Sequence, residues 1–164
     1  MKIRVGIGYD VHRLVQDHPF YLGGVLIPHS HGAFGHSDAD VVLHVICDAL
    51  LGAANFRNIG FHFSDKDPKW KGANSKLFLE KVLEMIVEKG YSVGNVDVTV
   101  VLQEPKLNPY IPEMKSIIAG ILKVEVEEIS IKATTSEHIG FVGRGEGVAA
   151  HCVVLIEKNN LPNS

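Results

Sequence analysis

Cysteine is scarce in this chain, and long apolar runs are absent. Its 164 residues include only Cys47 and Cys152. Both lie in apolar runs, where reduced core thiols rather than a disulfide framework are typical. No run is long enough to span a membrane, and no charged-then-apolar signal region precedes the first strand-like run. We therefore expect a cytoplasmic protein with no membrane partner.

An excess of charge of one sign is also missing. The formal net charge is −3, from 16 Lys and Arg against 19 Asp and Glu. No basic stripe or block stands out, and a nucleic-acid surface needs one. We therefore expect no nucleic-acid partner. A small anionic substrate is still compatible, because a few local basic residues can hold phosphates in a protein that is nearly neutral overall.

Linkers, repeats and low-complexity tracts do not occur, so one domain over residues 1–164 is predicted. Strand-like and helix-like patterns alternate instead. The predicted strands cover residues 3–12, 93–102, 129–133 and 147–156, a hairpin covers 21–28, and the helices cover about 39–51, 75–89 and 112–122. This order predicts an α+β two-layer sandwich: a mixed four-stranded sheet covered on one face by about three helices, plus the short hairpin.

Several residues predict details within these elements. Gly6 and Gly8 indicate a close backbone approach in the first strand. Ser37 or Asp38 is the expected N-cap of the first helix, and Gly52 its expected end. Ser75 is the expected N-cap of the second helix. Residues 55–74 form a long aperiodic loop, which is typical of a functional segment.

Nine histidines occur in the sequence, and three positions predict a metal site. Asp10 and His12 are two positions apart in a strand, so their side chains point to the same side. Asp40, His44 and Asp48 share one helix face, which we expect to look toward solvent or a site. If that face meets the strand end, Asp10, His12 and His44 surround one divalent ion and leave a position open, as in catalytic zinc sites. Asp40 or Asp48 would then orient an imidazole, although a solvated face is the simpler interpretation for these two alone.

A hydroxyl-rich segment predicts phosphate binding. Thr134, Thr135 and Ser136 precede Glu137, and a Gly-rich run with Arg144 follows. Hydroxyls, backbone N–H groups and a guanidinium suit phosphate oxygens, and a carboxylate beside them suits Mg²⁺. An ordinary turn is the alternative. Residues 102–107 leave a strand through Pro105, which exposes backbone groups that could contact a nucleobase or simply end the strand.

Together these segments resemble the family of 2-C-methyl-D-erythritol 2,4-cyclodiphosphate synthases, in order and from about residue 4 to 157. The resemblance is carried by Asp10-Val11-His12, His36-Ser37-Asp38, residues 48–53, Ser64-Asp65-Lys66-Asp67-Pro68, Lys71-Gly72, residues 132–135 and residues 143–147. Two positions depart from the family pattern. Asn58 stands where the family usually has Asp, and Ser64 where it usually has Pro.

The resemblance implies an enzyme, a phosphorus–oxygen lyase of non-mevalonate isoprenoid biosynthesis. It would convert 4-diphosphocytidyl-2-C-methyl-D-erythritol 2-phosphate to the 2,4-cyclodiphosphate and CMP. A non-catalytic, metal-dependent cytidine nucleotide-binding module is the rival interpretation. A zinc hydrolase with His36 as general base is a third. The absence of any Ser-His-Asp or Cys-His signature agrees with cyclisation, because the nucleophile is a phosphate of the substrate itself.

The resemblance also implies roles for individual residues. Asp10, His12 and His44 would bind Zn²⁺, Glu137 would bind Mg²⁺ or Mn²⁺ between the substrate phosphates, and His36 with Thr135 would position and stabilise the transition state. The implied substrate-binding residues are Asp10, His12, His36, Ser37, Asn58, Gly60, Phe63, Asp65, Asp67, Leu102, Pro105, Lys106, Leu107, Thr134, Thr135, Glu137, Phe141 and Arg144.

Within that set, the resemblance divides the substrate between two regions. The 63–67 loop with Ser37 and Gly60 would hold the erythritol part. Residues 102–108 with Thr134 would hold the cytidine diphosphate end. Phe141 and Arg144 would line the mouth of the site or a cavity between subunits.

Finally, the resemblance implies a homotrimer with a site at each subunit junction. Residues 141–147 and the final strand at 148–156 carry small and apolar side chains with few charges. We therefore expect them to form the three-fold contact. The alternative is that they fill the chain's own core.

Overall fold

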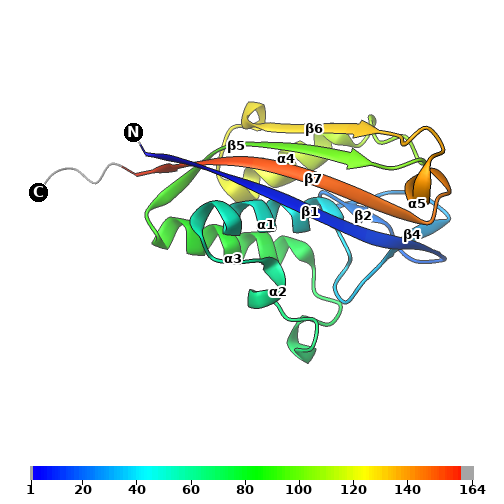
Figure 1. The fold of residues 1–164 in the computed structure, drawn as a ribbon, viewed down its shortest axis with the longest axis horizontal. Coiled ribbons are helices and arrows are strands. Elements are labelled where there is room, and N and C mark those ends of the chain that lie inside the picture. The colour runs from blue at the N-terminus through cyan, green and yellow to red at the C-terminus, as the bar shows by residue number, and fades with distance from the viewer. Residues whose placement is uncertain (1, 160–164) are drawn as a thin grey trace, which may run out of the picture.

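The computed structural model describes residues 2–159, and Figure 1 shows how its elements are arranged. The strands are β1 (Ile3–Gln16), β2 (Tyr21–Leu22), β3 (Val25–Leu26), β4 (His31–Phe34), β5 (Tyr91–Val101), β6 (Ile129–Thr134) and β7 (Gly147–Lys158). The helices are α1 (Val41–Ala54), α2 (Ile59–His62), α3 (Ser75–Glu88), α4 (Ile111–Leu122) and α5 (Gly140–Gly143), with 3-10 turns η1 (Pro68–Trp70) and η2 (Val126–Glu128).

The predicted α+β fold with a mixed sheet and a hairpin is confirmed. The main sheet has the order β4-β1-β7-β5-β6, and β2 pairs with β3 in a separate hairpin. The β5–β6 pair is parallel and the other pairs are antiparallel. The sheet has five strands rather than the expected four. The difference arises because β1 continues to Gln16, where residues 13–16 pair with β4, a strand too short to show an alternating pattern.

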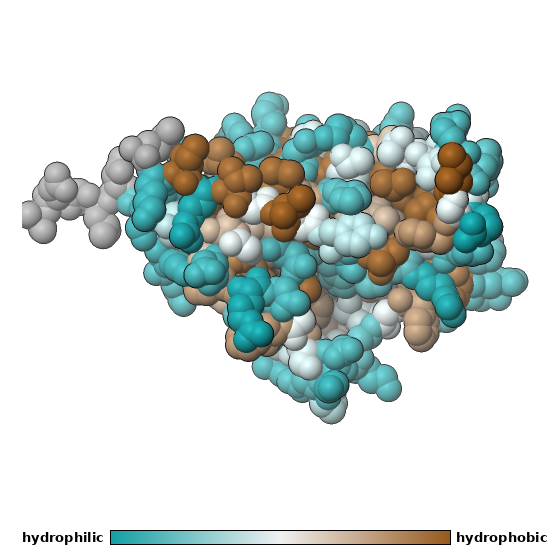
Figure 2. Space-filling view, viewed as in Figure 1, coloured by the Kyte–Doolittle hydropathy of each residue, from teal (hydrophilic) through white to brown (hydrophobic). Residues whose placement is uncertain are grey.

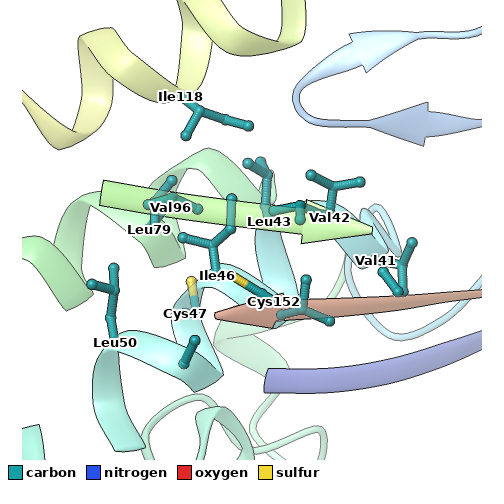
Figure 3. Packing of buried hydrophobic residues seen from close by; sticks show 14 of the residues in the cluster. Val41, Val42, Leu43, Ile46, Cys47, Leu50, Leu79, Val96, Ile118 and Cys152 are labelled. Atoms are coloured by element: carbon teal, nitrogen blue, oxygen red, sulfur yellow. The ribbon is translucent and has the colours of Figure 1, made fainter. Parts of the chain in front are cut away.

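Helices cover only one face of this sheet, and the core lies between the two layers. Along β5, and along β7 from Ala150 onward, buried residues alternate with more exposed neighbours, whereas the first residues of β7 are all buried. Figure 3 shows the packing between layers, with side chains contributed by Leu43, Ile46 and Leu50 of α1, Leu79 of α3, Ile118 of α4, Val96 of β5 and Cys152 of β7. α1 is buried along nearly its whole length, so its position against the sheet is fixed.

Two glycines of β1 allow α1 to lie directly across that strand. A Cβ atom added at Gly6 would lie 1.9 Å from the carbonyl oxygen of Ala49, and one at Gly8 would lie 2.0 Å from that of Val45. Side chains cannot occupy this space, so the predicted close approach is confirmed. It brings the middle of α1 next to the part of β1 that carries Asp10.

The N-cap of α1 is Asp40, not Ser37 or Asp38 as predicted. Its carboxylate accepts the N–H groups of Val42 and Leu43 at 3.1 Å, and those of Gly23 and Gly24 at 2.9 and 2.7 Å. Asp40 is fully buried, so a solvated position was the wrong expectation. Burial raises the pKa of its carboxyl, against the opposing effect of these N–H groups. These four hydrogen bonds to Asp40 attach the β2–β3 hairpin to the start of α1.

The other predicted helix boundaries shift by a few residues. α1 continues past Gly52, and Asn55 ends it in a left-handed conformation with φ of 60°. Asn74 rather than Ser75 caps α3, through a bond from the N–H of Lys76. Ser75 is therefore the first residue of the helix, and its hydroxyl is available for another partner.

The uncovered face of the sheet is partly hydrophobic. Its exposed apolar side chains on β1 are Ile3, Val5, Ile7, Tyr9 and Val11, and Figure 2 shows hydrophobic side chains gathered along this side of the molecule. Most apolar residues of β7, in contrast, are buried beneath the helices. The expectation that the final strand supplies an apolar contact surface is therefore wrong for most of its length. Among residues 2–159, no helix is long and apolar enough to span a membrane.

Candidate active site

Asp10, His12 and His44 converge as predicted, because α1 crosses β1 beside them. Nδ1 of His44 lies 3.0 Å from Oδ2 of Asp10 and 3.0 Å from Nε2 of His12, which is itself 3.1 Å from Oδ2 of Asp10. Within residues 2–159, this is the group that could hold a metal ion. Tetrahedral ligands about 2.0–2.1 Å from zinc stand roughly 3.3 Å from one another. The three atoms need little movement to reach that geometry.

The electrostatics of the triad suit a cation. Burial of Asp10 alone would raise its pKa, but the hydrogen bonds and charges of His12 and His44 outweigh burial and hold this pKa well below its usual range. Asp10 therefore stays a carboxylate. Two imidazole nitrogens and one carboxylate oxygen are the donors that zinc and related divalent ions prefer.

His44 is buried rather than on a surface-facing side of α1. Its Nε2 lies 2.9 Å from the hydroxyl of Ser75 and 3.2 Å from that of Ser37.

The expectation that Asp40 or Asp48 orients an imidazole is wrong. Asp40 caps α1, and Asp48 accepts the N–H of Ile59 at 2.6 Å. Partial burial raises the pKa of Asp48.

A cavity of about 260 Å³ opens beside the triad. Its lining residues are His12, His36, Ser37, His44, Ile59, Gly60, Phe63, Asp65, Trp70 and Phe78. The cavity thus brings two of the three triad residues together with five residues implied by the resemblance: His36, Ser37, Gly60, Phe63 and Asp65. Asn58 and Asp67 are not among the lining residues. Asn58 precedes α2 and is exposed, and the Asp67 carboxylate accepts the N–H of Lys69.

Two features of this cavity are absent from the sequence-based predictions. Phe63 stacks on Phe78 at 4.8 Å between ring centroids, and Trp70 meets both rings edge-on. Trp70 and Phe78 were not predicted, although a single Trp in a polar loop was a usable signal. Nε2 of His36 is buried and has no hydrogen-bond partner within residues 2–159, so this polar atom is free to bond a ligand.

A second cavity, also about 260 Å³, lies where β5 and β6 end. Its lining residues are Leu102, Gln103, Pro105, Lys106, Leu107, Asn108, Ala133, Thr134 and Thr135. The residues that the resemblance assigns to the cytidine diphosphate end are therefore in one place, except Glu104, which lines a neighbouring cavity. Parallel strands bring this about, because β5 and β6 end side by side with Val101 opposite Thr134.

Glu137 and Arg144 lie next to residues that line this cavity, whereas Phe141 does not line it. The Thr135 hydroxyl donates to a carboxylate oxygen of Glu137 at 3.0 Å, and both residues are exposed. Arg144 pairs with Glu146 at 2.8 Å and lines a neighbouring cavity with Leu102 and Gln103. Phe141 packs against the backbone of Gly147 rather than lining any of these cavities.

The metal triad and the second cavity do not meet within one chain. Val11 of β1 pairs with Ala149 of β7, which pairs with Val101 of β5, which pairs with Thr134 of β6. Three strand spacings of about 4.8 Å separate β1 from β6, or roughly 14 Å. The two cavities share no lining residue.

Comparison with known proteins gives a consistent result. Residues 3–157 match the model of the YgbB family. The 2-C-methyl-D-erythritol 2,4-cyclodiphosphate synthase of Bacteroides thetaiotaomicron is 54% identical, over 97% of this chain and 100% of the relative. A structure of the IspF–CDP complex from Plasmodium falciparum is 33% identical, with a TM-score of 0.85, over 96% of this chain and 97% of that one. The bifunctional IspDF of Campylobacter jejuni is 39% identical with a TM-score of 0.92, and this chain covers 42% of its length.

Proposed function

The chain belongs to the YgbB family, and we propose that it cyclises 4-diphosphocytidyl-2-C-methyl-D-erythritol 2-phosphate to 2-C-methyl-D-erythritol 2,4-cyclodiphosphate with release of CMP. The observation that carries the proposal is the metal triad at the edge of a cavity, together with a separate nucleotide-sized cavity whose lining matches the implied cytidine site. A non-catalytic nucleotide-binding module explains the second cavity but gives no role to the open-sided triad.

The reaction needs positioning and charge neutralisation rather than a protein nucleophile. The 2-phosphate of the substrate attacks its own β-phosphate, so the protein must bend the substrate into a ring-closing pose. The cavity walls formed by Phe63, Trp70 and Phe78 are rigid because the rings pack on one another. They would exclude water from the erythritol part, and Ser37, Gly60 and Asp65 of the same lining would offer polar contacts.

We assign Zn²⁺ to Asp10, His12 and His44, whose donor atoms fit it. When bound there, the ion supplies Lewis-acid polarisation of a phosphate oxygen. Glu137 offers a hard, exposed carboxylate for Mg²⁺ or Mn²⁺, which prefer oxygen ligands. Thr135 holds that carboxylate through its hydroxyl. His36 lines the cavity with His12 and Ser37, and its Nε2, which has no hydrogen-bond partner among residues 2–159, would donate to a substrate phosphate.

The cytidine diphosphate end is assigned to the second cavity. Pro105, Leu107 and Ala133 supply apolar contacts for a base, and Lys106 and Thr134 supply donors for phosphate. The CDP complex of the Plasmodium falciparum relative supports a cytidine nucleotide as the ligand. Arg144 and Phe141 remain assigned to the mouth of the site or to a cavity between subunits.

A homotrimer with sites at subunit junctions reconciles the two separated cavities. One chain would supply the metal triad and its neighbour the cytidine cavity. The exposed apolar side chains of β1 favour an assembly that covers them.

For the compartment, we propose the cytoplasm, because Cys47 and Cys152 are buried free thiols whose pKa values burial raises.

Incubation of the protein with the diphosphocytidyl substrate, Zn²⁺ and Mg²⁺ tests the reaction. We expect the cyclic diphosphate and CMP in equal amounts, detected by phosphorus NMR. Open-chain monophosphates would indicate a zinc hydrolase instead. Binding of the substrate without turnover would indicate the nucleotide-binding module.

A further inference from the structure

The two ring nitrogens of His44 face different groups. Nδ1 points to Asp10 and His12 in the candidate metal centre, each at 3.0 Å. Nε2 lies 2.9 Å from the hydroxyl oxygen of Ser75. A neutral imidazole carries one proton, on one nitrogen or the other, and a nitrogen that binds a metal cannot carry it. Metal binding through Nδ1 therefore requires the proton on Nε2.

The surroundings of Ser75 determine which way its hydrogen bonds run. The side chain is fully buried, and its hydroxyl bonds to one carboxylate oxygen of Asp38. The N–H of Ser75 donates to the other oxygen of Asp38 at 3.0 Å. A carboxylate only accepts, so the single hydroxyl proton points to Asp38. The Ser75 oxygen is then left to accept the Nε2–H of His44.

Backbone contacts hold the two segments that carry Asp38 and Ser75. The N–H of Asp38 donates to the carbonyl of Ala73 at 3.1 Å, and that of Gly72 donates to the carbonyl of His36 at 2.8 Å. These bonds join the segment before α1 to the segment before α3. The chain of bonds from His44 to Ser75 to Asp38 is thus fixed before any ligand arrives.

We propose that Asp38 and Ser75 are positioning residues that hold His44 as its Nε2–H tautomer and so increase the affinity of the centre for a divalent cation. The proposal rests on the proposed function only in that Asp10, His12 and His44 bind the ion. Neither Asp38 nor Ser75 lines the cavity beside the triad, so neither contacts the substrate there. Outer hydrogen-bond partners of ligating histidines act in this way, and their loss typically lowers metal affinity by about 10- to 100-fold.

Asp38→Asn tests the direction of the bonds with almost no change of shape. Backbone N–H groups face both oxygens of Asp38: that of Ser75 at 3.0 Å and that of Asp40 at 3.3 Å. The amide oxygen of the introduced asparagine should face the closer donor, the N–H of Ser75. The amide NH₂ group then faces the Ser75 hydroxyl and donates to it, which turns the hydroxyl proton toward His44. That arrangement favours the Nδ1–H tautomer, which cannot bind a metal through Nδ1.

Ser75→Ala removes the bond without reversing it. The hydroxyl of Ser37, 3.2 Å from the same nitrogen, remains as a weaker partner for Nε2–H. Ser75→Ala should therefore weaken zinc binding less than Asp38→Asn, and Ser75→Thr, which keeps a hydroxyl, should restore binding. Asn74→Ala is the matched control, because it removes the N-cap of α3 without touching His44.

The experiment measures two quantities in each purified, folded variant: the Kd for Zn²⁺ by competition with a chromophoric chelator, and, by ¹⁵N NMR of the metal-free protein, whether Nε2 of His44 carries a proton. Nε2 is the informative atom, because the nearby Asp10 carboxylate favours a proton on Nδ1 when no metal is bound. We expect a proton on Nε2 in the parent, its loss in Asp38→Asn, and a Kd about 10- to 100-fold higher in that variant. Asn74→Ala should lower the unfolding temperature and leave the Kd unchanged.

The outcomes separate this proposal from the proposed function. Suppose that the parent binds Zn²⁺ and cyclises the substrate, while folded Asp38→Asn keeps both the parent's His44 tautomer and its Kd. That result would overturn the proposed role of the Asp38–Ser75–His44 hydrogen bonds and leave the proposed function standing. If folded Asp38→Asn could not be obtained, an unchanged Kd in Ser75→Ala would overturn it equally. Conversely, the parent could show the Nε2–H proton and the variants the expected changes in Kd, with no cyclic product formed. That result would support the role of Asp38 and Ser75 and reject the proposed function.

Discussion

His44 is the residue on which both the metal site and its support depend. It is the one triad member contributed by a helix, and its two nitrogens connect the strand ligands to the buried hydroxyl of Ser75. His44→Ala should remove bound zinc and reduce turnover below detection. Because the side chain is buried, unfolding free energy should also fall, by about 1–2 kcal/mol. Metal analysis and thermal unfolding check this, and His18→Ala, at an exposed histidine, should retain both the metal and full activity.

Glu137 allows a separate test of the second ion. Glu137→Gln keeps the shape but replaces a carboxylate with an amide, which is a poorer Mg²⁺ ligand. The Mg²⁺ concentration for half-maximal activity should rise, while zinc content stays at the parent level. Glu128→Gln, at an exposed glutamate in η2, should leave the Mg²⁺ dependence unchanged. An identical Mg²⁺ response in Glu137→Gln would assign the ion elsewhere.

At this scale, spacing along the chain predicts the site only where partners are close in sequence or share an element. Asp10 and His12 follow from the two-residue period of a strand. The pairing of His44 with Ser75 does not, because 31 residues separate them and Ser75 looks like a helix cap. Asp40 was misassigned for a related reason. Its two helix N–H groups could be foreseen, but the two from Gly23 and Gly24 come from a hairpin placed by tertiary packing.

Among the elements, the contact between β1 and α1 decides whether the triad forms. Gly8→Ala places a methyl group 2.0 Å from a backbone carbonyl of α1, so the helix must move outward. We expect a loss of about 2–3 kcal/mol in unfolding free energy and weaker zinc binding, because His44 retreats from Asp10. Gly52→Ala is the control: its new Cβ would lie 3.9 Å from the nearest atom, and it should stabilise α1 by up to about 1 kcal/mol. Chemical denaturation measures both.

The elements themselves were more predictable than their ends. Alternating apolar residues define β5 and β7, and apolar stripes define α3 and α4, because each element buries a single face. α1 ends later than predicted because it is buried on nearly all sides, so a glycine inside it is tolerated. β4 escaped prediction because four residues with one glycine show no period, and it exists only through pairing with β1.

For the whole molecule, the uncovered face of the sheet is the main feature that one chain leaves unexplained. Ile7 is 73% exposed and lies in the middle of the apolar row on β1. If that row forms the three-fold contact, Ile7→Lys should convert the trimer to monomers and abolish activity. Light scattering at working concentration measures this. Val87→Lys introduces the same charge at a half-exposed apolar residue of α3 and should leave assembly and activity intact. A parent that is a fully active monomer would refute the trimer.

A site shared between chains makes a quantitative prediction for mixed assemblies. In the proposed trimer, His44→Ala should inactivate the metal half of a junction, and Lys106→Glu should inactivate the cytidine half by placing a carboxylate where the substrate phosphates are proposed to bind. In trimers reassembled from an equal mixture, a junction works only if its metal half comes from the Lys106 variant and its cytidine half from the His44 variant. Random assembly makes this combination about one quarter of all junctions. Activity should therefore recover to roughly a quarter of the parent value. A mixture of His44→Ala with His12→Ala should stay inactive, because both changes damage the same half. If each chain held a complete site, the first mixture would stay as inactive as the second.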